Sequence, residues 1–242
     1  KLFHIIMKKI NNKLIKLIKY YTLINHNLIF DKNAINRYDK TLNETNSDKI
    51  SDLDSLKKLI INLKNCNLKK KAKNIVFSDG NPNSKVMIIG EGPGANEDIE
   101  GLPFVGRAGQ LLDKMLQAIN LDRTKVYITN VVNYRPPENR KPTEEEILRY
   151  LPFLVKHIEI IKPKILVLLG STALNSILGS EKVISKARGI WVTKQIGSWK
   201  TNVIASFHPA YLMRQPDQKK HSWVDLKMIK KKLEDLNIKI DN

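Results

Sequence analysis

The chain has 242 residues, which suits one α/β domain with an N-terminal extension and enough length to bury a core. Its 42 Lys and Arg residues exceed the 24 Asp and Glu residues, so the formal net charge of +18 favours a polyanionic partner, nucleic acid above all. One cysteine, Cys66, excludes an intramolecular disulfide, and no apolar run approaches the roughly 18 residues of a membrane span, so we expect a protein of a reducing bacterial cytoplasm without membrane contact.

Residues 1–54 are predicted to precede the main domain. Residues 1–28 carry apolar positions at helical spacing between lysines, which predicts a basic amphipathic helix and not a targeting peptide. Residues 31–54 are polar and lack apolar periodicity, so we predict a linker there. Part of the lysine excess also fits the bias of an AT-rich coding sequence. The main domain is predicted over residues 55–242, beginning with a helix at 55–63.

Four apolar runs alternate with helical segments in this domain. The runs predict strands at 86–89, 125–132, 165–169 and 203–206, and helices are predicted at 109–119, 143–163, 173–178 and 222–236. Strands that alternate with helices pair in parallel and carry helices on both faces. We therefore predict a three-layer α/β/α sandwich with a central, mostly parallel four-stranded sheet.

The first of these strands runs into a loop that is rich in glycine and acidic residues. Glycines let a backbone approach a ligand closely, and ligands bind at the carboxyl ends of strands in open α/β sheets. Glu91 and His208 follow two predicted strands, and Asn130 lies at the carboxyl end of a third. We therefore expect the three side chains on one edge of the sheet, at an active site.

The loop also fits a dinucleotide-binding pattern. Residues 90–95 follow a strand and match G-x-G-x-x-G/A. Such a site needs a helix that starts on the glycines, whereas the prolines and glycines between Pro93 and Gly106 predict irregular chain until about Ala108. Carboxylates in the loop would also repel a phosphate. We therefore expect no nucleotide cofactor.

Several motifs, in the same order, resemble those of the family 4 (type 4) uracil-DNA glycosylases. The resemblance spans about residues 56–236, and its motifs are residues 90–94, 97–98, 101–106, 108–109, 129–132, 135–137, 139–140 and 208–212. It implies the uracil-DNA glycosylase fold and a hydrolase that removes uracil flipped out of DNA, which initiates base-excision repair. It also implies uracil-containing DNA as the partner and a monomeric enzyme.

The resemblance assigns roles in the uracil pocket. Asn130 corresponds to the family's uracil-reading asparagine, and a fixed carboxamide can donate to uracil O4 and accept from N3–H, where cytosine presents the opposite polarities. His208 resembles the histidine that hydrogen-bonds uracil O2 as negative charge grows there. Phe104 is expected to stack on the flipped base. Gly92 and Asn139 complete the predicted pocket.

Acidic and basic side chains are predicted around the pocket. Glu91 is expected to position the attacking water and to offset the cationic sugar, with Glu97 next and Asp98 after it, although the sequence does not rank them firmly. For DNA contacts we predict that arginines hold phosphates and that residues after His208 fill the gap left by the flipped base. These residues are Arg135, Arg140, Tyr211, Leu212 and Arg214.

The chain departs from the family at one feature. Family 4 enzymes carry a 4Fe–4S cluster on four cysteines, and here the corresponding positions hold Leu63, Cys66, Tyr134 and Tyr150. One cysteine cannot hold a cubane cluster, so we predict no cofactor and no metal, with the tyrosines and Leu63 filling the space beside a buried thiol.

Two other functions remain open from the sequence. A catalytically inactive DNA-binding module of the same fold would keep the basic surface and release no base, and a nucleotide-binding oxidoreductase would bind nicotinamide or flavin. A related branch captures uracil-DNA covalently through a histidine in a basic insertion after the first motif. We find no such insertion between Leu112 and Asn130 and expect no covalent capture.

Overall fold

The computed structural model describes residues 46–179 and 182–238. The predicted N-terminal helix and most of the predicted linker lie outside these residues. The helix predicted from Ser55 begins earlier, because α2 spans Asn46–Ile61 and takes in the last part of the predicted linker. Leu53 explains the difference: it lies three residues before Leu56 on the same helical face, and both are buried.

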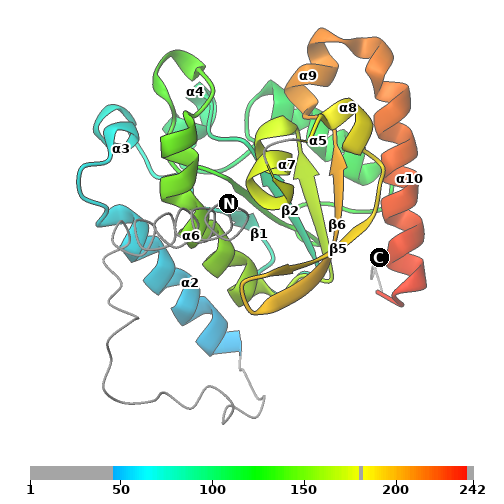
Figure 1. The fold of residues 1–242 in the computed structure, drawn as a ribbon, viewed down its shortest axis with the longest axis horizontal. Helices are drawn as coiled ribbons and strands as arrows, with labels where there is room; N and C mark the ends of the chain where they lie inside the picture. The colour runs from blue at the N-terminus through cyan, green and yellow to red at the C-terminus, as the bar shows by residue number, and fades with distance from the viewer. Residues whose placement is uncertain (1–45, 180–181, 239–242) are drawn as a thin grey trace, which may run out of the picture. The chain divides into compact units, whose positions relative to one another are not determined.

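Six strands form one mixed sheet in the order β1-β3-β2-β4-β6-β5 (Figure 1). The four central strands, β3 (Tyr127–Asn130), β2 (Val86–Gly90), β4 (Ile165–Leu169) and β6 (Trp199–Ser206), are parallel. At the edges, β1 (Asp79–Gly80) and β5 (Val192–Ile196) pair antiparallel. The prediction of four strands is therefore wrong. Both edge strands give weak sequence signals, since β1 has two residues and β5 is half exposed.

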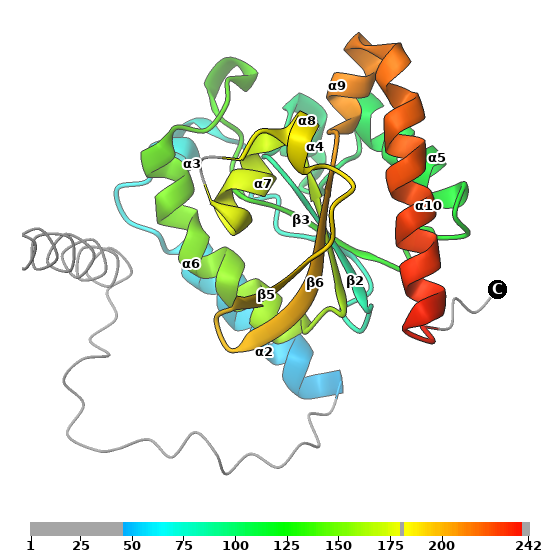
Figure 2. The ribbon, with the colours of Figure 1, turned by 45° about the vertical axis from the view of Figure 1, so that its right-hand side comes forward.

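Helices cover both faces of the sheet (Figure 2). On one face α2, α6 (Glu144–Ile161) and α7 (Ser171–Leu178) form a core cluster with Met87 and Ile89 of β2. On the other face α5 (Arg107–Gln117), α9 (Pro209–Arg214) and α10 (Lys219–Asp235) form a second cluster with Val86 and Ile88. Alternate residues of a strand point to opposite faces, so the apolar run of β2 supplies both clusters. The three-layer α/β/α prediction agrees with this arrangement.

Five short elements complete the fold. They are α3 (Asn67–Lys71), α4 (Ala95–Glu100), η1 (Pro137–Asn139), α8 (Ile184–Ala187) and η2 (Pro216–Gln218). The prediction of irregular chain between Pro93 and Ala108 is wrong at α4, which begins after Gly94 and ends at Gly101 in the left-handed region with φ 74°. In the described part of the chain, no helix has the length and apolar character needed to cross a bilayer.

Candidate active site

One cavity lies at the carboxyl ends of the parallel strands. Its volume is about 180 Å³, several times the ~30 Å³ that one water occupies in the liquid. Eight of the predicted site residues line it, and these are Glu91, Gly92, Glu97, Phe104, Asn130, Asn139, Arg140 and His208. The expectation that residues following different strands meet on one edge of the sheet agrees with this cavity. Arg135, Tyr211, Leu212 and Arg214 do not line it.

Asn130 ends β3 with its side chain in the cavity wall, where only 3% of the residue is exposed. Within the described ranges no group hydrogen-bonds its carboxamide, so the amide can donate to and accept from a ligand. Gly90, the residue paired with Asn130 across β2 and β3, makes room for it. A Cβ at Gly90 would lie 2.5 Å from Cζ of Phe104 and still closer to Oδ1 of Asn130.

Phe104 is held in an unusual backbone conformation beside the cavity. Its φ of 56° is in the left-handed region, which costs a non-glycine residue about 1–2 kcal/mol. Arg123 compensates, because its guanidinium donates to the carbonyl oxygens of Phe104 and Pro103 and also pairs with Asp79 and Asp113. The Phe104 ring is buried and stacks on His208 with 5.5 Å between ring centroids. The loop therefore presents a fixed aromatic face.

His208 caps the first turn of α9. Its Nδ1 accepts a hydrogen bond from the main-chain N–H of Ala210 at 3.2 Å, which places the proton of the neutral ring on Nε2. Burial, and then the positive charge of Arg214, lower the pKa of His208 to about 4, while Glu97 acts in the opposite direction. The ring is therefore neutral at pH 7 and offers one N–H donor.

The predicted carboxylates have different surroundings. Glu91 accepts a hydrogen bond from the hydroxyl of Thr172 at its Oε2. Glu97 uses both oxygens on the main chain, accepting from the N–H groups of Gly94 at 3.1 Å and Gly106 at 2.9 Å. Glu97 thus links the main chain at Gly94 to the main chain at Gly106, the two sides of the loop.

Asp98 is buried and does not line the cavity. It accepts hydrogen bonds from the main-chain N–H groups of Lys73 and Asn74. Asp98 is therefore a loop anchor, and Glu91 is the carboxylate best placed to act on a ligand.

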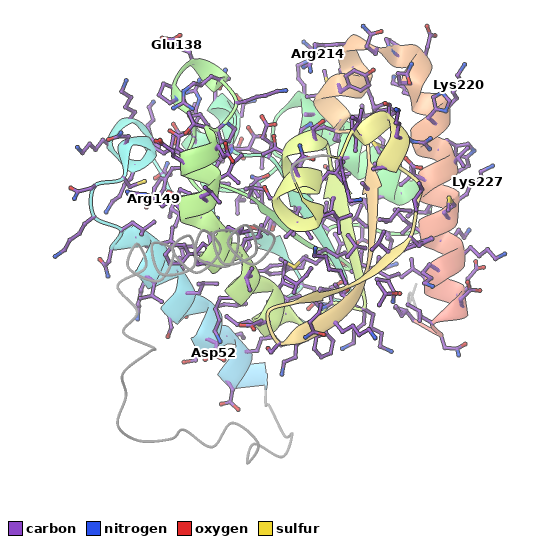
Figure 3. All side chains as sticks on the ribbon, viewed as in Figure 1. Asp52, Glu138, Arg149, Arg214, Lys220 and Lys227 are labelled. Carbon is purple, nitrogen blue, oxygen red and sulfur yellow. The ribbon has the colours of Figure 1, made fainter. Side chains whose placement is uncertain are left out.

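Two of the predicted DNA-contacting arginines are hydrogen-bonded within the fold. Arg140 donates to both carboxylate oxygens of Glu146 at 2.7 and 2.8 Å. Nε of Arg135 donates to Oδ1 of Asn139 at 2.8 Å, which joins it to the cavity lining. Arg214 is exposed at the end of α9 (Figure 3).

Leu212, which the sequence analysis predicts to contact DNA, is buried in this structure. The residue is 1% exposed and lies in the core cluster formed with α5 and α10. Four residues after the capping His208, the helical turn of α9 directs Leu212 toward the core. Tyr211 and Met213 on either side of it are partly exposed.

The four positions at which the family carries cluster cysteines lie together on one side of the molecule. Cys66 and Tyr150 are buried, and their Sγ and OH atoms are 3.2 Å apart at hydrogen-bonding distance. Tyr134 is buried beside them, and burial followed by the thiol's charge raises its pKa. Leu63 is partly buried and packs against the hydrophobic core cluster that contains these three residues. One thiol and two phenols do not supply the four thiolates of a cubane cluster, so this set of donors does not fit it.

Two residues that the sequence does not predict as part of the site, Arg123 and Thr172, contact residues that line the cavity. Arg123 and Thr172 are remote in sequence from their partners, with Thr172 separated by 81 positions from Glu91. No local pattern marks either residue. Among the residues described, no three His, Cys, Asp or Glu side chains are grouped so that they could hold a metal ion.

Comparisons with known proteins identify the family of this chain. A sequence model of the Uracil DNA glycosylase superfamily matches residues 77–230. The chain is 38% identical to a type-4 uracil-DNA glycosylase of Saccharolobus solfataricus over 198 residues, covering 80% of this chain and 92% of the relative. It is 46% identical to the Thermotoga maritima type-4 enzyme over 62% of this chain and 77% of that one. It is also 40% identical to the type-4 enzyme of Pyrobaculum aerophilum, over 73% and 92%.

The match to the superfamily model covers every residue that lines the cavity. The α/β/α sheet with a polar cavity at its carboxyl edge is the arrangement in which open α/β proteins bind small ligands, and the superfamily match assigns the chain to the DNA glycosylases. The chain belongs to the uracil-DNA glycosylase superfamily, and within it to the type-4 uracil-DNA glycosylases.

Proposed function

We propose that this chain hydrolyses the N-glycosidic bond of uracil flipped out of DNA and so initiates base-excision repair. The observation that carries the proposal is the convergence of Asn130, Phe104, His208 and Glu91 on one cavity. A donor–acceptor amide, an aromatic face, a neutral N–H donor and a carboxylate are the groups that uracil release needs. The type-4 relatives support the same reaction.

Uracil recognition follows from the cavity wall. The flipped base stacks against Phe104, and this contact offsets part of the few kcal/mol that unstacking costs. The carboxamide of Asn130 donates to O4 and accepts from N3–H, so cytosine would meet it with both polarities reversed. Cytosine in this site would leave buried polar groups without hydrogen-bond partners, so the site should reject it strongly.

Bond cleavage follows from His208 and Glu91. The bond between C1′ and N1 breaks, and its electron pair leaves with uracil as an anion whose charge spreads to O2. The Nε2–H of His208 donates to O2, a role worth about 3 kcal/mol in comparable sites. A water oxygen bonds to C1′ as its proton passes to the Glu91 carboxylate, which also offsets the sugar cation.

We propose that DNA binding uses basic residues of α9 and α10. Arg214 extends from α9, and Lys220 and Lys227 extend from α10 (Figure 3). Tyr211 remains available as a wedge into the base stack, since it is partly exposed. Contacts of this kind to phosphates make the affinity fall steeply with salt.

We further propose a monomer that uses no nucleotide cofactor and acts in a bacterial cytoplasm. The helix after the glycine loop, α4, has six residues, and Glu97 occupies the N–H of its capping Gly94. A pyrophosphate would need that N-terminus free of a carboxylate. The single cysteine suits a reducing compartment.

We also propose that the enzyme works without an iron–sulfur cluster. The buried pair of Cys66 and Tyr150 joins the segment before α3 to α6, where the family's cluster would join them. Arg149 adds a second tie, donating to the carbonyl oxygens of Lys64 and Asn65 at 3.1 and 2.7 Å. Direct hydrogen bonds thus replace metal–thiolate bonds between the same two segments.

The test is alkaline cleavage of an end-labelled oligonucleotide that contains one uracil. The wild type should cleave at uracil, and Asn130→Ala and His208→Ala should lose about 100-fold or more of the rate. His221→Ala and Asn202→Ala are matched controls away from the cavity and should keep the wild-type rate. Tight DNA binding without cleavage by the wild type would leave an inactive binding module.

Iron is measured on the same protein preparation. We expect the wild-type protein to contain no iron beyond background and to be fully active on uracil-containing DNA. Stoichiometric iron that Cys66→Ser removes would contradict the cluster-free proposal while leaving the glycosylase proposal intact.

A further inference from the structure

The turn between β4 and α7 lies between two groups of the cavity. In the sheet β4 is flanked by β2 and β6. Glu91 directly follows β2, and His208 lies two residues after β6. This turn comprises Gly170 and the first two residues of α7, Ser171 and Thr172, and none of them lines the cavity. Thr172 contacts Glu91, and Gly170 lies against His208.

One contact of this turn is a hydrogen bond to a carboxylate. The hydroxyl of Thr172 donates to Oε2 of Glu91. Within residues 46–179 and 182–238 the other oxygen, Oε1, accepts no hydrogen bond. A carboxylate side chain has rotatable bonds, and a hydrogen bond to one of its oxygens restricts the positions that the other can take. The hydrogen bond from Thr172 therefore restricts the orientation of Oε1.

The turn itself is held in place relative to both groups. The N–H of Gly170 donates to the carbonyl oxygen of Ser206 at 2.9 Å, which ties the turn to the end of β6. Gly170 has φ 89°, and a Cβ there would lie 3.0 Å from Cβ of His208. Glycine meets both requirements, since it adopts positive φ without strain and leaves room for the histidine. Thr172 therefore acts from a fixed position.

We infer that Thr172 is a positioning residue for Glu91, whose hydroxyl holds Oε2 so that Oε1 faces the attacking water and the sugar cation. The inference rests on the proposed function and deepens it, because it adds a residue to the same site. Thr172 does not touch the base or the reacting atoms. Its effect should therefore appear in the rate of bond cleavage and not in DNA affinity.

The first test compares three variants in single-turnover release of uracil. Thr172→Val keeps the shape of the side chain and removes the donor, and we expect a loss of about tenfold or more, the size of one hydrogen bond to a charged group. Thr172→Ser keeps the donor and should restore most of the rate. Thr193→Val makes the same substitution on the edge strand β5, where the hydroxyl contacts Asn202, and should keep the wild-type rate.

Two further readouts separate positioning from folding. Affinity for a duplex that carries a tetrahydrofuran abasic analogue, and the urea midpoint of unfolding, should both match the wild type in Thr172→Val. A rate loss that came with lost stability or lost affinity, and that serine did not restore, would overturn the inference.

The decisive experiment is a double-mutant cycle with Glu91→Ala. If Thr172 acts through Glu91, then Thr172→Val should have little effect in the Glu91→Ala background, so the two losses should not add. Additive losses would overturn the inference, as would a Thr172→Val enzyme as fast as the wild type. Failure of the proposed function is a different result, because the wild type itself would then release no uracil.

Discussion

The main-chain N–H of Ala210 donates to Nδ1 of His208 at 3.2 Å. This contact caps α9 and also selects the ring tautomer, because the nitrogen that accepts cannot carry the proton. Nε2 is then the donor at the cavity. A single helix cap thus sets both the direction and the protonation of the group that is proposed to stabilise the uracil anion.

His208 should remain neutral well below the usual range of histidine. Burial lowers its pKa to about 4, against about 6.5 for an exposed ring. We expect ¹⁵N NMR of the imidazole to show the Nε2–H tautomer from pH 8 down to pH 5, with protonation only near pH 4. The single-turnover rate should show no inflection near pH 6.5 from this residue. A ring that titrates near 6.5 would contradict this assignment.

Gly90→Ala should disable the cavity without unfolding the protein. The new Cβ would lie 2.5 Å from Cζ of Phe104 and would also overlap Oδ1 of Asn130, so both must move. A displacement of about 1 Å in a positioned group can cost 100-fold in rate. We expect a loss of that size in uracil release, with DNA affinity close to that of the wild type. A fully active Gly90→Ala enzyme would show that this packing does not set the geometry of the pocket.

The sequence predicts the central strands and most of the cavity for the same physical reason. Buried parallel strands are continuous apolar runs, and the residues that follow them must meet at one edge of the sheet. This reasoning places Glu91, Asn130 and His208 at one edge of the sheet, whereas the roles of Asn130 and His208 come from the family resemblance. The predicted number of strands is wrong in part because β5 is an edge strand. Its sequence contains polar residues between Val192 and Ile196, so no continuous apolar run marks it.

Long-range contacts are what the sequence does not reveal. Thr172 reads as the start of a helix, and its hydrogen bond to Glu91 depends on β2 and β4 being neighbours. The burial of Leu212 is likewise not visible in the sequence. Its place in a recognised motif suggested a surface role, whereas the direction of α9 turns it into the core. Motif membership identifies a segment, and only packing decides which of its side chains face outward.

Arg123→Met should destabilise the protein and also slow uracil release. The side chain is three-quarters buried, pairs with Asp79 and Asp113, and donates to the carbonyl oxygen of Phe104. Removing it leaves two carboxylates and a strained Phe104 without their shared partner. We expect roughly 2–3 kcal/mol of lost stability by urea unfolding.

Arg149→Met is the matched control for this substitution. Arg149 is partly exposed and donates to the main-chain carbonyl groups of Lys64 and Asn65, and it does not line the cavity. The control should keep the wild-type rate of uracil release. Equal rates for Arg123→Met and Arg149→Met would show that Phe104 does not depend on Arg123.

Because of His157, the free energy of unfolding should begin to decrease at a higher pH than it would if only carboxylates titrated. The ring is buried, stacks on Phe77 with 4.6 Å between centroids, and lies 2.7 Å from the hydroxyl of Tyr127 at Nε2. Burial lowers its pKa to about 3. Between pH 6.5 and about 3 the unfolded chain therefore binds a proton that the folded chain does not, so the free energy of unfolding decreases as the pH falls.

The size and origin of this decrease can be measured against His157→Gln, which removes the titrating group and keeps a polar side chain. The variant should be less stable than the wild type at pH 7.5, because it disturbs the contacts with Phe77 and Tyr127. One pH unit corresponds to about 1.4 kcal/mol, so the difference should shrink by roughly 2 kcal/mol between pH 6.5 and pH 5. His208 and the carboxylates titrate in both proteins and cancel from the comparison. Urea unfolding from pH 5 to 7.5 supplies the measurement, and a difference that stays constant with pH would mean that the pKa of His157 is the same in the folded and the unfolded protein.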